Sequence, residues 1–472
     1  MVEVVKKKTI NYNFSQKHKD YIKRTADNMF NFAEGAVRAG KTVDHIFAFA
    51  HELKTTEDRI HIATGSTEAN AKLNIGDCNG YGLEYYFRGQ CRWGKFKGNE
   101  CLYIKGPSTG YKEKVVIFAG GAKADSFKKI RGNSYGMWIA TEINLHHDNT
   151  IKEVFNRTIA AKRRKIFWDL NPDNPNSFIY TDYIDAYEKK DKEGKLLGGY
   201  NYEHFTIDDN INIPEERKEL IKSQYDKDSI WYIRDILGKR CVAEGLIYRT
   251  FADDMSANEG KRFYISHEQL KEKRFMEINI GVDFGGSGSG HSFSATGITV
   301  GYKEVVALCT ERWKEGNPDK GDKVTQYATN IDPDKLGELF VNFVKRVINT
   351  YGYLANINYA YMDSAEQTLI RGLRTALEKA KLFSIDVRNA RKSEINDRIR
   401  CTRLLMAQGR YFVTEDCQSL VSALNTAVWN PKNKTEDERL DDGSVDVDSL
   451  DAHEYSFEKE IKNLVEYIQV QR

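Results

Sequence analysis

Residues 35–42 read Gly-Ala-Val-Arg-Ala-Gly-Lys-Thr, a complete G-x-x-x-x-G-K-[ST] pattern. Gly35 and Gly40 allow the backbone to turn so that its N–H groups point inward at phosphate oxygens. Lys41 supplies a positive charge for the β- and γ-phosphates of a nucleotide, and the hydroxyl of Thr42 is a ligand for Mg²⁺. The pattern therefore predicts a phosphate-binding loop, which strongly restricts the folds open to the chain.

The sequence on either side of this loop fits a strand–loop–helix unit. Residues 29–33 form a short aromatic run that predicts a strand, and residues 43–50 are apolar at helical spacing. The N-terminus of that helix would face the bound anion. We expect the loop to bind ATP with Mg²⁺ through Gly35, Arg38, Gly40, Lys41 and Thr42.

Length and charge limit the classes of protein that remain open. A chain of 472 residues predicts two domains. The net charge is only +2, so any DNA-binding surface has to be a local patch, such as the basic run at 162–165, whose alternative is a solvated helix end. No apolar run approaches the length of a membrane span, so no membrane partner is expected. The seven cysteines contain no C-x-x-C pair, which favours reduced thiols of a cytosolic protein.

The first half of the chain alternates predicted strands and helices. Strands are expected at 59–65, 114–119, 135–142 and 165–170, with a β-excursion over 78–112. Strands separated by helices indicate a parallel sheet covered on both faces, with ligand sites at the carboxyl ends of its strands.

Three residues near those strand ends are candidates for chemistry on the nucleotide. Glu142 follows an apolar strand, where a carboxylate can orient the attacking water of an ATPase; the alternative is a surface glutamate. Arg131 lies in a loop from which it could stabilise charge on the transferring phosphoryl group, or it belongs to a solvated basic loop. Asn171 directly follows the strand predicted at 165–170. It could couple hydrolysis to movement, or it could merely form an Asn-Pro turn.

The second half carries a different set of carboxylates. Three antiparallel strands are expected at 276–286, 293–300 and 304–309, with Asp283 at the centre of the first. Asp363 ends a further predicted strand that starts at residue 357.

A predicted helix near the C-terminus supplies the remaining acidic positions. Asp448 and Asp451 are three residues apart and therefore lie on one face of this helix. With Asp283 and Asp363 they suit a two-metal nuclease, in which carboxylates hold Mg²⁺ or Mn²⁺. With so many acidic residues, a coincidental grouping is the alternative. Basic residues could grip a phosphate backbone beside such a site, or belong to an ordinary charged helix: Arg388, Arg391, Lys392, Arg398 and Arg400.

Taken in order, these motifs resemble the large subunit of a tailed-bacteriophage terminase, of the PBSX-type branch, over nearly the whole chain. The segments that carry the resemblance are 34–42, 141–145, 169–172, 238–248, 281–285, 362–365 and 451–455.

The resemblance implies an α/β chain of two domains. An N-terminal P-loop ATPase of the RecA/ASCE-like kind, with a parallel sheet, would occupy residues 1–255, including a small lid or linker subdomain at about 205–255. A linker would follow at 256–264, and a C-terminal ribonuclease-H-like α/β nuclease at 265–472.

The resemblance also implies a viral genome-packaging role in the cytoplasm of a bacterial host. ATP hydrolysis would drive double-stranded DNA into a procapsid, and a Mg²⁺- or Mn²⁺-dependent endonuclease would cut concatemeric DNA. Expected partners are DNA, a small terminase subunit and the portal of the procapsid, on which the chain would form a homo-oligomeric ring, with a monomer possible in solution. The residues implied are Lys41 and Thr42 for ATP and Mg²⁺, Glu142 as the catalytic glutamate, Arg131 as a trans-acting arginine finger, Asn171 for coupling, and Asp283, Asp363, Asp448 and Asp451 for the nuclease metals.

One position departs from the family pattern. The family usually has Asp-Glu at the end of its Walker B strand, whereas this chain has Thr141-Glu142. A neutral hydroxyl is a weaker partner for Mg²⁺ than a carboxylate, so slower ATP turnover or a higher magnesium requirement is expected. Two other functions stay open, namely a helicase-like DNA translocase or nuclease of repair or recombination, and a non-catalytic DNA-binding scaffold.

Overall fold

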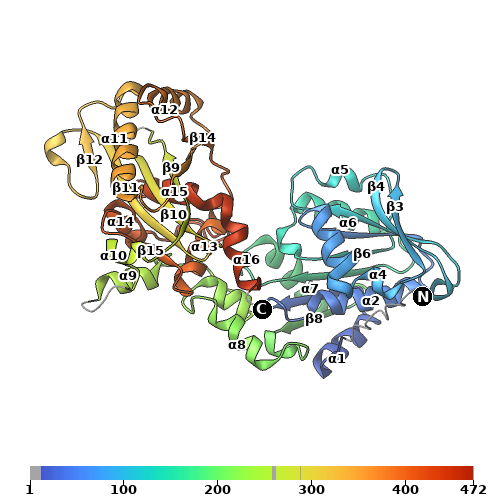
Figure 1. The fold of residues 1–472 in the computed structure, drawn as a ribbon. Coiled ribbons are helices and arrows are strands. Elements are labelled where there is room, and N and C mark those ends of the chain that lie inside the picture. Colours follow the sequence, from blue (N-terminus) through green and yellow to red (C-terminus); the bar gives the residue numbers. More distant parts are fainter. Residues whose placement is uncertain (1–11, 258–261, 287–288, 471–472) are drawn as a thin grey trace, which may run out of the picture. The chain divides into compact units, whose positions relative to one another are not determined.

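The structure is a computed structural model that describes residues 12–257, 262–286 and 289–470 (Figure 1). The chain divides into two compact units, each with its own sheet and core. The first unit comprises residues 1–222 and 230–242, and the second comprises 223–229 and 243–472. This division differs from the expected domain border, because residues 223–229 and 243–255 group with the second unit. Residues 258–261 of the expected linker lie outside the described part.

The first unit is built on an eight-stranded sheet in the order β3-β4-β5-β2-β6-β7-β1-β8. Its strands are β1 (Phe30–Gly35), β2 (Ile60–Gly65), β3 (Cys91–Phe96), β4 (Asn99–Ile104), β5 (Lys114–Gly120), β6 (Met137–Ala140), β7 (Lys165–Leu170) and β8 (Tyr200–Phe205). Neighbours from β5 to β8 run parallel, whereas β3 and β4 form an antiparallel excursion. The predicted parallel sheet and its β-excursion are confirmed.

Helices connect these strands. They are α1 (Gln16–Thr25), α2 (Lys41–Thr55), α3 (Glu68–Ala71), α4 (Leu83–Tyr86), α5 (Phe127–Ile130), α6 (Asp148–Thr158), α7 (Asp185–Lys192) and α8 (Glu215–Ser223). Side chains alternate between the two faces of the sheet, as the period of a strand requires. In β7, Phe167 packs in the core that includes α2, whereas Ile166 and Trp168 pack in the core of the other face. Asp169 therefore points to the same side of the sheet as α2.

The second unit contains a seven-stranded mixed sheet in the order β12-β11-β10-β9-β13-β14, with β15 pairing with β11. Its strands are β9 (Phe275–Asp283), β10 (His291–Thr299), β11 (Val305–Glu315), β12 (Gln326–Ala328), β13 (Ile357–Met362), β14 (Asp386–Asn389) and β15 (Tyr411–Val413). The predicted antiparallel arrangement of the first three strands is confirmed. Asp283, however, ends β9 instead of lying at its centre.

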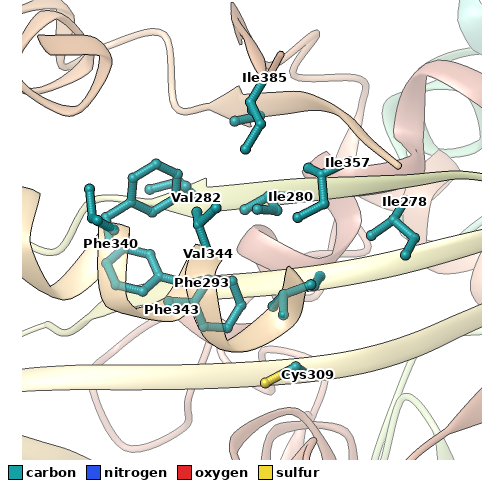
Figure 2. Packing of buried hydrophobic residues seen from close by; sticks show 14 of the residues in the cluster. Ile278, Ile280, Val282, Phe293, Cys309, Phe340, Phe343, Val344, Ile357 and Ile385 are labelled. Carbon is teal, nitrogen blue, oxygen red and sulfur yellow. The ribbon is translucent and has the colours of Figure 1, made fainter. Parts of the chain in front are cut away.

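The helices of the second unit are α9 (Arg249–Ser256), α10 (His267–Lys271), α11 (Pro333–Tyr351), α12 (Gln367–Lys379), α13 (Ile395–Ala407), α14 (Gln418–Thr426), α15 (Asp448–Phe457) and α16 (Ile461–Val470). Figure 2 shows Ile280 and Val282 of β9 grouped with Phe340 and Phe343 of α11, so α11 covers one face of this sheet. The alternate residues of β9 face the other side, against α15. No helix in the described residues is long and apolar enough to cross a membrane.

Candidate functional site

The phosphate-binding loop runs from the end of β1 into the first residue of α2. Gly35 has a φ of 149°, and a Cβ placed on it would lie 1.8 Å from the carbonyl oxygen of Phe205. Only glycine fits there, because both the backbone angle and the space exclude a side chain. Gly40 has a φ of 100°, a left-handed conformation that turns the chain into the helix. The predicted strand–loop–helix unit is therefore present.

Lys41 is buried inside this loop. Its Nζ donates hydrogen bonds to the carbonyl oxygens of Gly35 and Ala36 at 2.8 and 2.7 Å, and to Oδ1 of Asn171 at 3.1 Å. Burial lowers the pKa of Lys41 to about 8, although nearby carboxylates, first that of Asp169, oppose the shift. A buried ammonium held by carbonyl dipoles fits a phosphate, since an anion would offset the cost of burying the charge.

Asp169 of β7 lies at the centre of the polar groups around the loop. Its Oδ1 accepts hydrogen bonds from the hydroxyl of Thr141 at 3.1 Å and from the backbone N–H of Glu142 at 3.0 Å. Burial raises the pKa of Asp169, and the N–H of Glu142, the Lys41 ammonium and the hydroxyl of Thr42 oppose that rise. Its Oδ2 is buried without a hydrogen-bond partner among the described residues. An orphaned carboxylate oxygen beside Lys41 and Thr42 fits a cation that accompanies a nucleotide.

Glu142 is the second residue after β6, at the carboxyl end where ligands of parallel sheets bind. Its φ of 53° is unusual for a residue with a side chain, and its backbone N–H is held by Asp169. The structure thus brings Lys41, Thr42, Glu142 and Asn171 to one region around Asp169.

Arg38 and Arg131 are placed differently. Arg38 lies in the loop with a φ of 59°, and its carbonyl oxygen accepts a hydrogen bond from Asn210. Arg131 follows α5, exposed, with its Nε 3.5 Å from a carboxylate oxygen of Glu153 and its guanidinium over the ring of Phe127. None of its contacts within the described residues is to the phosphate-binding loop. Its role as a trans-acting finger stays a prediction.

The carboxylates of the second unit converge on the end of β9. Asp283 ends that strand, Asp363 directly follows the neighbouring β13, and Asp448 and Asp451 lie in the first turn of α15. Gly281 explains how the helix reaches the sheet, since a Cβ on it would lie 1.8 Å from the carbonyl oxygen of Ala452. The absence of a side chain allows the backbone of α15 to contact β9 directly.

The charges of this group act on Asp283. Burial raises the pKa of Asp283 well above its usual value, and the charges of Asp451, Asp448 and Asp363 raise it further. Such a concentration of carboxylates suits a divalent cation, which removes their mutual repulsion.

Basic groups and one backbone N–H hold the other three carboxylates. Asp363 pairs with Lys392 at 2.5 Å, and Asp451 with Arg398 and Arg439 at 3.0 and 2.5 Å. Asp448 accepts hydrogen bonds from Arg312 and from the N–H of Gly290 at 2.9 and 2.8 Å. No cluster of three or more side chains in metal-ligating geometry occurs within the described residues. Metal binding would therefore have to displace some of these contacts.

The comparisons with known proteins agree on one family. Residues 33–252 match the family model described as terminase large subunit, T4likevirus-type, N-terminal. The matched residues make up less than half of the 472-residue chain, so they show that its N-terminal part is similar to large terminase subunits. The branch within the family, expected to be PBSX-type, stays a prediction. A search of curated proteins finds no match.

Solved structures show the same fold over nearly the whole chain. It is similar to the large terminase of a thermophilic bacteriophage, with a TM-score of 0.70 and 19% identity over 94% of this chain and 98% of that one. Complexes of the same bacteriophage protein with ADP and with ATP-gamma-S match with TM-scores of 0.68 and 0.67, at 19% and 18% identity and the same coverage.

The basic run at 162–165 makes contacts within the first unit. Lys162 pairs with Glu57, and Arg163 with Glu52. Arg164 and the buried Lys165 donate to backbone carbonyl oxygens. Lys162 and Arg163 are exposed, whereas Lys165 is buried, so a DNA-binding patch here stays a prediction and could involve only part of the run.

Arg398 also differs from its expected place. Its side chain is 4% exposed and pairs with Asp451 and Glu454, so it positions a carboxylate instead of presenting a charge to solvent. The sequence shows that this residue is charged, but it does not show which carboxylates the fold places beside it.

Two functional groupings were missed from the sequence. Asp169 belongs to the segment 169–172, one of those that carry the family resemblance, but no role was predicted for it, although a charged residue inside an apolar strand is a usable signal. The second is Glu34, which is 1% exposed and accepts hydrogen bonds from Arg240, Tyr180 and Tyr202. This network ties the segment 230–242 to the strand that leads into the loop, and no local pattern indicated it.

Proposed function

We propose that this chain is a large terminase subunit that hydrolyses ATP to translocate double-stranded viral DNA into a procapsid and cuts concatemeric DNA with a metal-dependent endonuclease. The observation that carries the motor function is the buried Lys41, whose Nζ lies among the loop carbonyls and contacts Asn171. The grouping of Asp363, Asp448 and Asp451 around Asp283 supports the nuclease function.

In the first unit, the residues of the chain bind and orient the nucleotide. The loop N–H groups and Lys41 neutralise phosphate charge, and Thr42 supplies an oxygen ligand for Mg²⁺. Glu142 orients the attacking water. Asn171 accepts a hydrogen bond from Lys41, so a movement of the lysine side chain would also move the residue that follows β7.

In the second unit, Asp283, Asp363, Asp448 and Asp451 would hold Mg²⁺ or Mn²⁺. These ions supply an activated water and stabilise the leaving oxygen of the phosphodiester. Lys392 and Arg439 keep two of the carboxylates in place. Lys392 is half-exposed and would be released towards the DNA backbone when metal binds Asp363.

The partners proposed for this subunit are a small terminase subunit and the portal of a procapsid. On the portal we expect a homo-oligomeric ring, in which Arg131 acts on the nucleotide of a neighbouring subunit, with a monomer in solution. The proposed location is the cytoplasm of the bacterial host. Mixing wild-type and Arg131→Ala subunits tests the ring, because a trans-acting residue makes activity fall more steeply than the mutant fraction.

Two variants test the two activities separately. Lys41→Ala should abolish DNA-stimulated ATP hydrolysis yet leave cleavage of plasmid DNA, because it removes a phosphate contact from the first unit only. Asp283→Ala should abolish cleavage with Mn²⁺ and leave ATP hydrolysis. Lys54→Ala, at an exposed position near the end of α2, is the matched control and should keep both activities.

The same assays decide between this function and its alternatives. A DNA-binding scaffold would show neither activity in the wild-type protein. A helicase-like translocase would separate the strands of a forked duplex, which a packaging motor does not require. Loss of both activities in either single variant would contradict the assignment of two separate sites.

A further inference from the structure

Position 141 raises a question about how this terminase holds the Mg²⁺ of its nucleotide. Thr141 is buried at the end of β6 and offers only a hydroxyl. That hydroxyl donates a hydrogen bond to Asp169, so its hydrogen already has a partner within the protein. A threonine in this state is a poor partner for Mg²⁺, which prefers carboxylate oxygens or water held by them.

The neighbouring strand supplies a carboxylate at the same level. β6 and β7 are parallel, with Ala140 paired with Trp168, so Thr141 and Asp169 lie side by side at the carboxyl end of the sheet. Asp169 points to the face covered by α2, whose first turn carries Lys41 and Thr42. The hydroxyl of Thr42 is among the groups that oppose the rise in the pKa of Asp169, so it lies close to that carboxylate.

The two oxygens of the Asp169 carboxylate differ in their surroundings. Oδ1 accepts the hydrogen bonds from the hydroxyl of Thr141 and from the N–H of Glu142. Oδ2 has no hydrogen-bond partner among the described residues. It is also buried, since Asp169 is only 3% exposed. A buried carboxylate oxygen without a donor is costly, so a cation beside it would stabilise the site.

We propose that Asp169 supplies the carboxylate for the Mg²⁺ that accompanies the nucleotide, in place of the acidic residue absent at position 141. Oδ1 fixes the orientation of the carboxylate through Thr141 and Glu142, and Oδ2 faces the cation directly or through water. The inference rests on the proposed nucleotide function of the first unit. It also changes the expectation from the sequence, because the carboxylate is present on the next strand and no higher magnesium requirement follows.

The test is the effect of Mg²⁺ on the binding of ATP-gamma-S to the full chain, measured by isothermal titration calorimetry. Asp169→Asn keeps the shape of the side chain and an acceptor for both hydrogen bonds. We expect the Mg²⁺ concentration that gives half of the affinity gain to rise about 10- to 100-fold, as when a residue that supports a metal site is lost. In excess EDTA, the variant should bind ATP-gamma-S at least as tightly as the wild type, because a negative charge near the phosphates has gone.

Two further variants make the result specific. Asp44→Asn also removes a buried carboxylate that acts on Lys41 and has one oxygen, Oδ1, without a hydrogen-bond partner among the described residues. Because His18 holds the other oxygen of Asp44, we expect the wild-type magnesium response to persist, so this variant tests whether an orphaned buried oxygen alone is enough. Thr141→Asp combined with Asp169→Asn moves the carboxylate to the neighbouring strand and should bring the Mg²⁺ midpoint back towards the wild-type value.

The outcomes separate this inference from the function on which it rests. If the wild-type protein does not bind ATP-gamma-S at all, the nucleotide function itself is wrong. If it binds and Asp169→Asn keeps the wild-type Mg²⁺ midpoint, Asp169 has only a structural role and the inference is overturned. Should Asp169→Asn fail to fold, Thr141→Val decides, because it removes one donor that orients the Asp169 carboxylate and leaves its charge; a raised Mg²⁺ midpoint supports the inference and a wild-type midpoint overturns it.

Discussion

At the scale of single residues, the contact between Glu34 and Arg240 gives a direct test of how the first unit is held together. Glu34 is buried next to the phosphate-binding loop, and Arg240 contacts both of its carboxylate oxygens at 2.7 to 3.0 Å. Removing one partner of such a pair leaves an uncompensated charge in the interior.

We therefore expect Arg240→Ala to lower the free energy of unfolding of the first unit by about 3 kcal/mol in urea titrations. Adding Glu34→Gln to this variant should recover part of the loss, because a neutral amide is less costly to bury. Arg24→Ala breaks the more exposed pair with Glu203 and should cost less than about 1 kcal/mol. Equal losses in Arg24→Ala and Arg240→Ala would contradict the argument.

The residue scale also shows what the sequence can reveal. Lys41 and Thr42 were predictable because their neighbours in the chain make the site, through a short motif with fixed spacing. Arg240 lies 206 residues from Glu34 and was not predictable, since no periodicity connects them. Asp169 and Thr141 meet only when β6 and β7 pair, so the orphaned oxygen of Asp169 becomes visible in the fold alone.

A buried histidine gives a prediction about pH. His61 in β2 is fully buried, and burial lowers its pKa to about 4 from 6.5. Between these two pH values the imidazole of His61 is protonated in the unfolded chain but stays neutral in the folded chain. The free energy of unfolding should therefore fall as the pH drops from 6.5 to about 4. The slope from this group is about 1.4 kcal/mol per pH unit.

His61→Gln should flatten the pH dependence of stability by this amount, measured by urea unfolding at several pH values between 4 and 7. His51→Gln is the matched control, because His51 lies exposed on α2. A wild-type slope in His61→Gln would show that His61 is not held neutral by the fold.

At the scale of elements, the contact between α15 and β9 determines whether the four carboxylates proposed to bind metal meet. Gly281 permits this contact, because any Cβ would overlap the backbone of Ala452. Gly281→Ala should force the helix away from the strand and lower the free energy of unfolding by about 1–3 kcal/mol, as overpacking does. It should also reduce Mn²⁺-dependent cleavage of DNA, while ATP hydrolysis stays at the wild-type level.

Gly372→Ala is a suitable control for this prediction. Gly372 lies inside α12 with no atom within 4 Å of an added Cβ, so alanine should be neutral or stabilise by about 0.4–1 kcal/mol. Cleavage at the wild-type rate by Gly281→Ala would mean that the position of α15 is not required for the metal site.

Most of the helices and strands were predictable from the sequence. Apolar runs at the right period gave the strands and helices, and the i, i+3 spacing put Asp448 and Asp451 on one helix turn. The sequence did not show that Arg398 and Arg439 fold back onto Asp451, because burial of a charge depends on the partner that the fold brings to it.

At the scale of the whole molecule, the border between the two units is open to experiment. Residues 243–255 pack within the second unit, where the N–H of Ile247 donates to the carbonyl oxygen of Ala427. Ile247, Tyr248 and Phe251 are at most 1% exposed. The hydroxyl of Tyr248 lies 3.4 Å from Glu454 on α15, the helix of the proposed metal ligands. We infer that the nuclease needs this segment, although it precedes the expected linker.

Two fragments test this border. One comprises residues 243–472, and the other starts at residue 265, where the sequence alone places the second domain. The shorter fragment loses three large buried side chains at 247, 248 and 251, each contributing about 1.5–3 kcal/mol. We expect it to melt at a clearly lower temperature and to gain less stability from Mn²⁺, since an ion stabilises only a site that is already folded. Equal melting temperatures and equal gains from Mn²⁺ for the two fragments would return the border to residues 256–264.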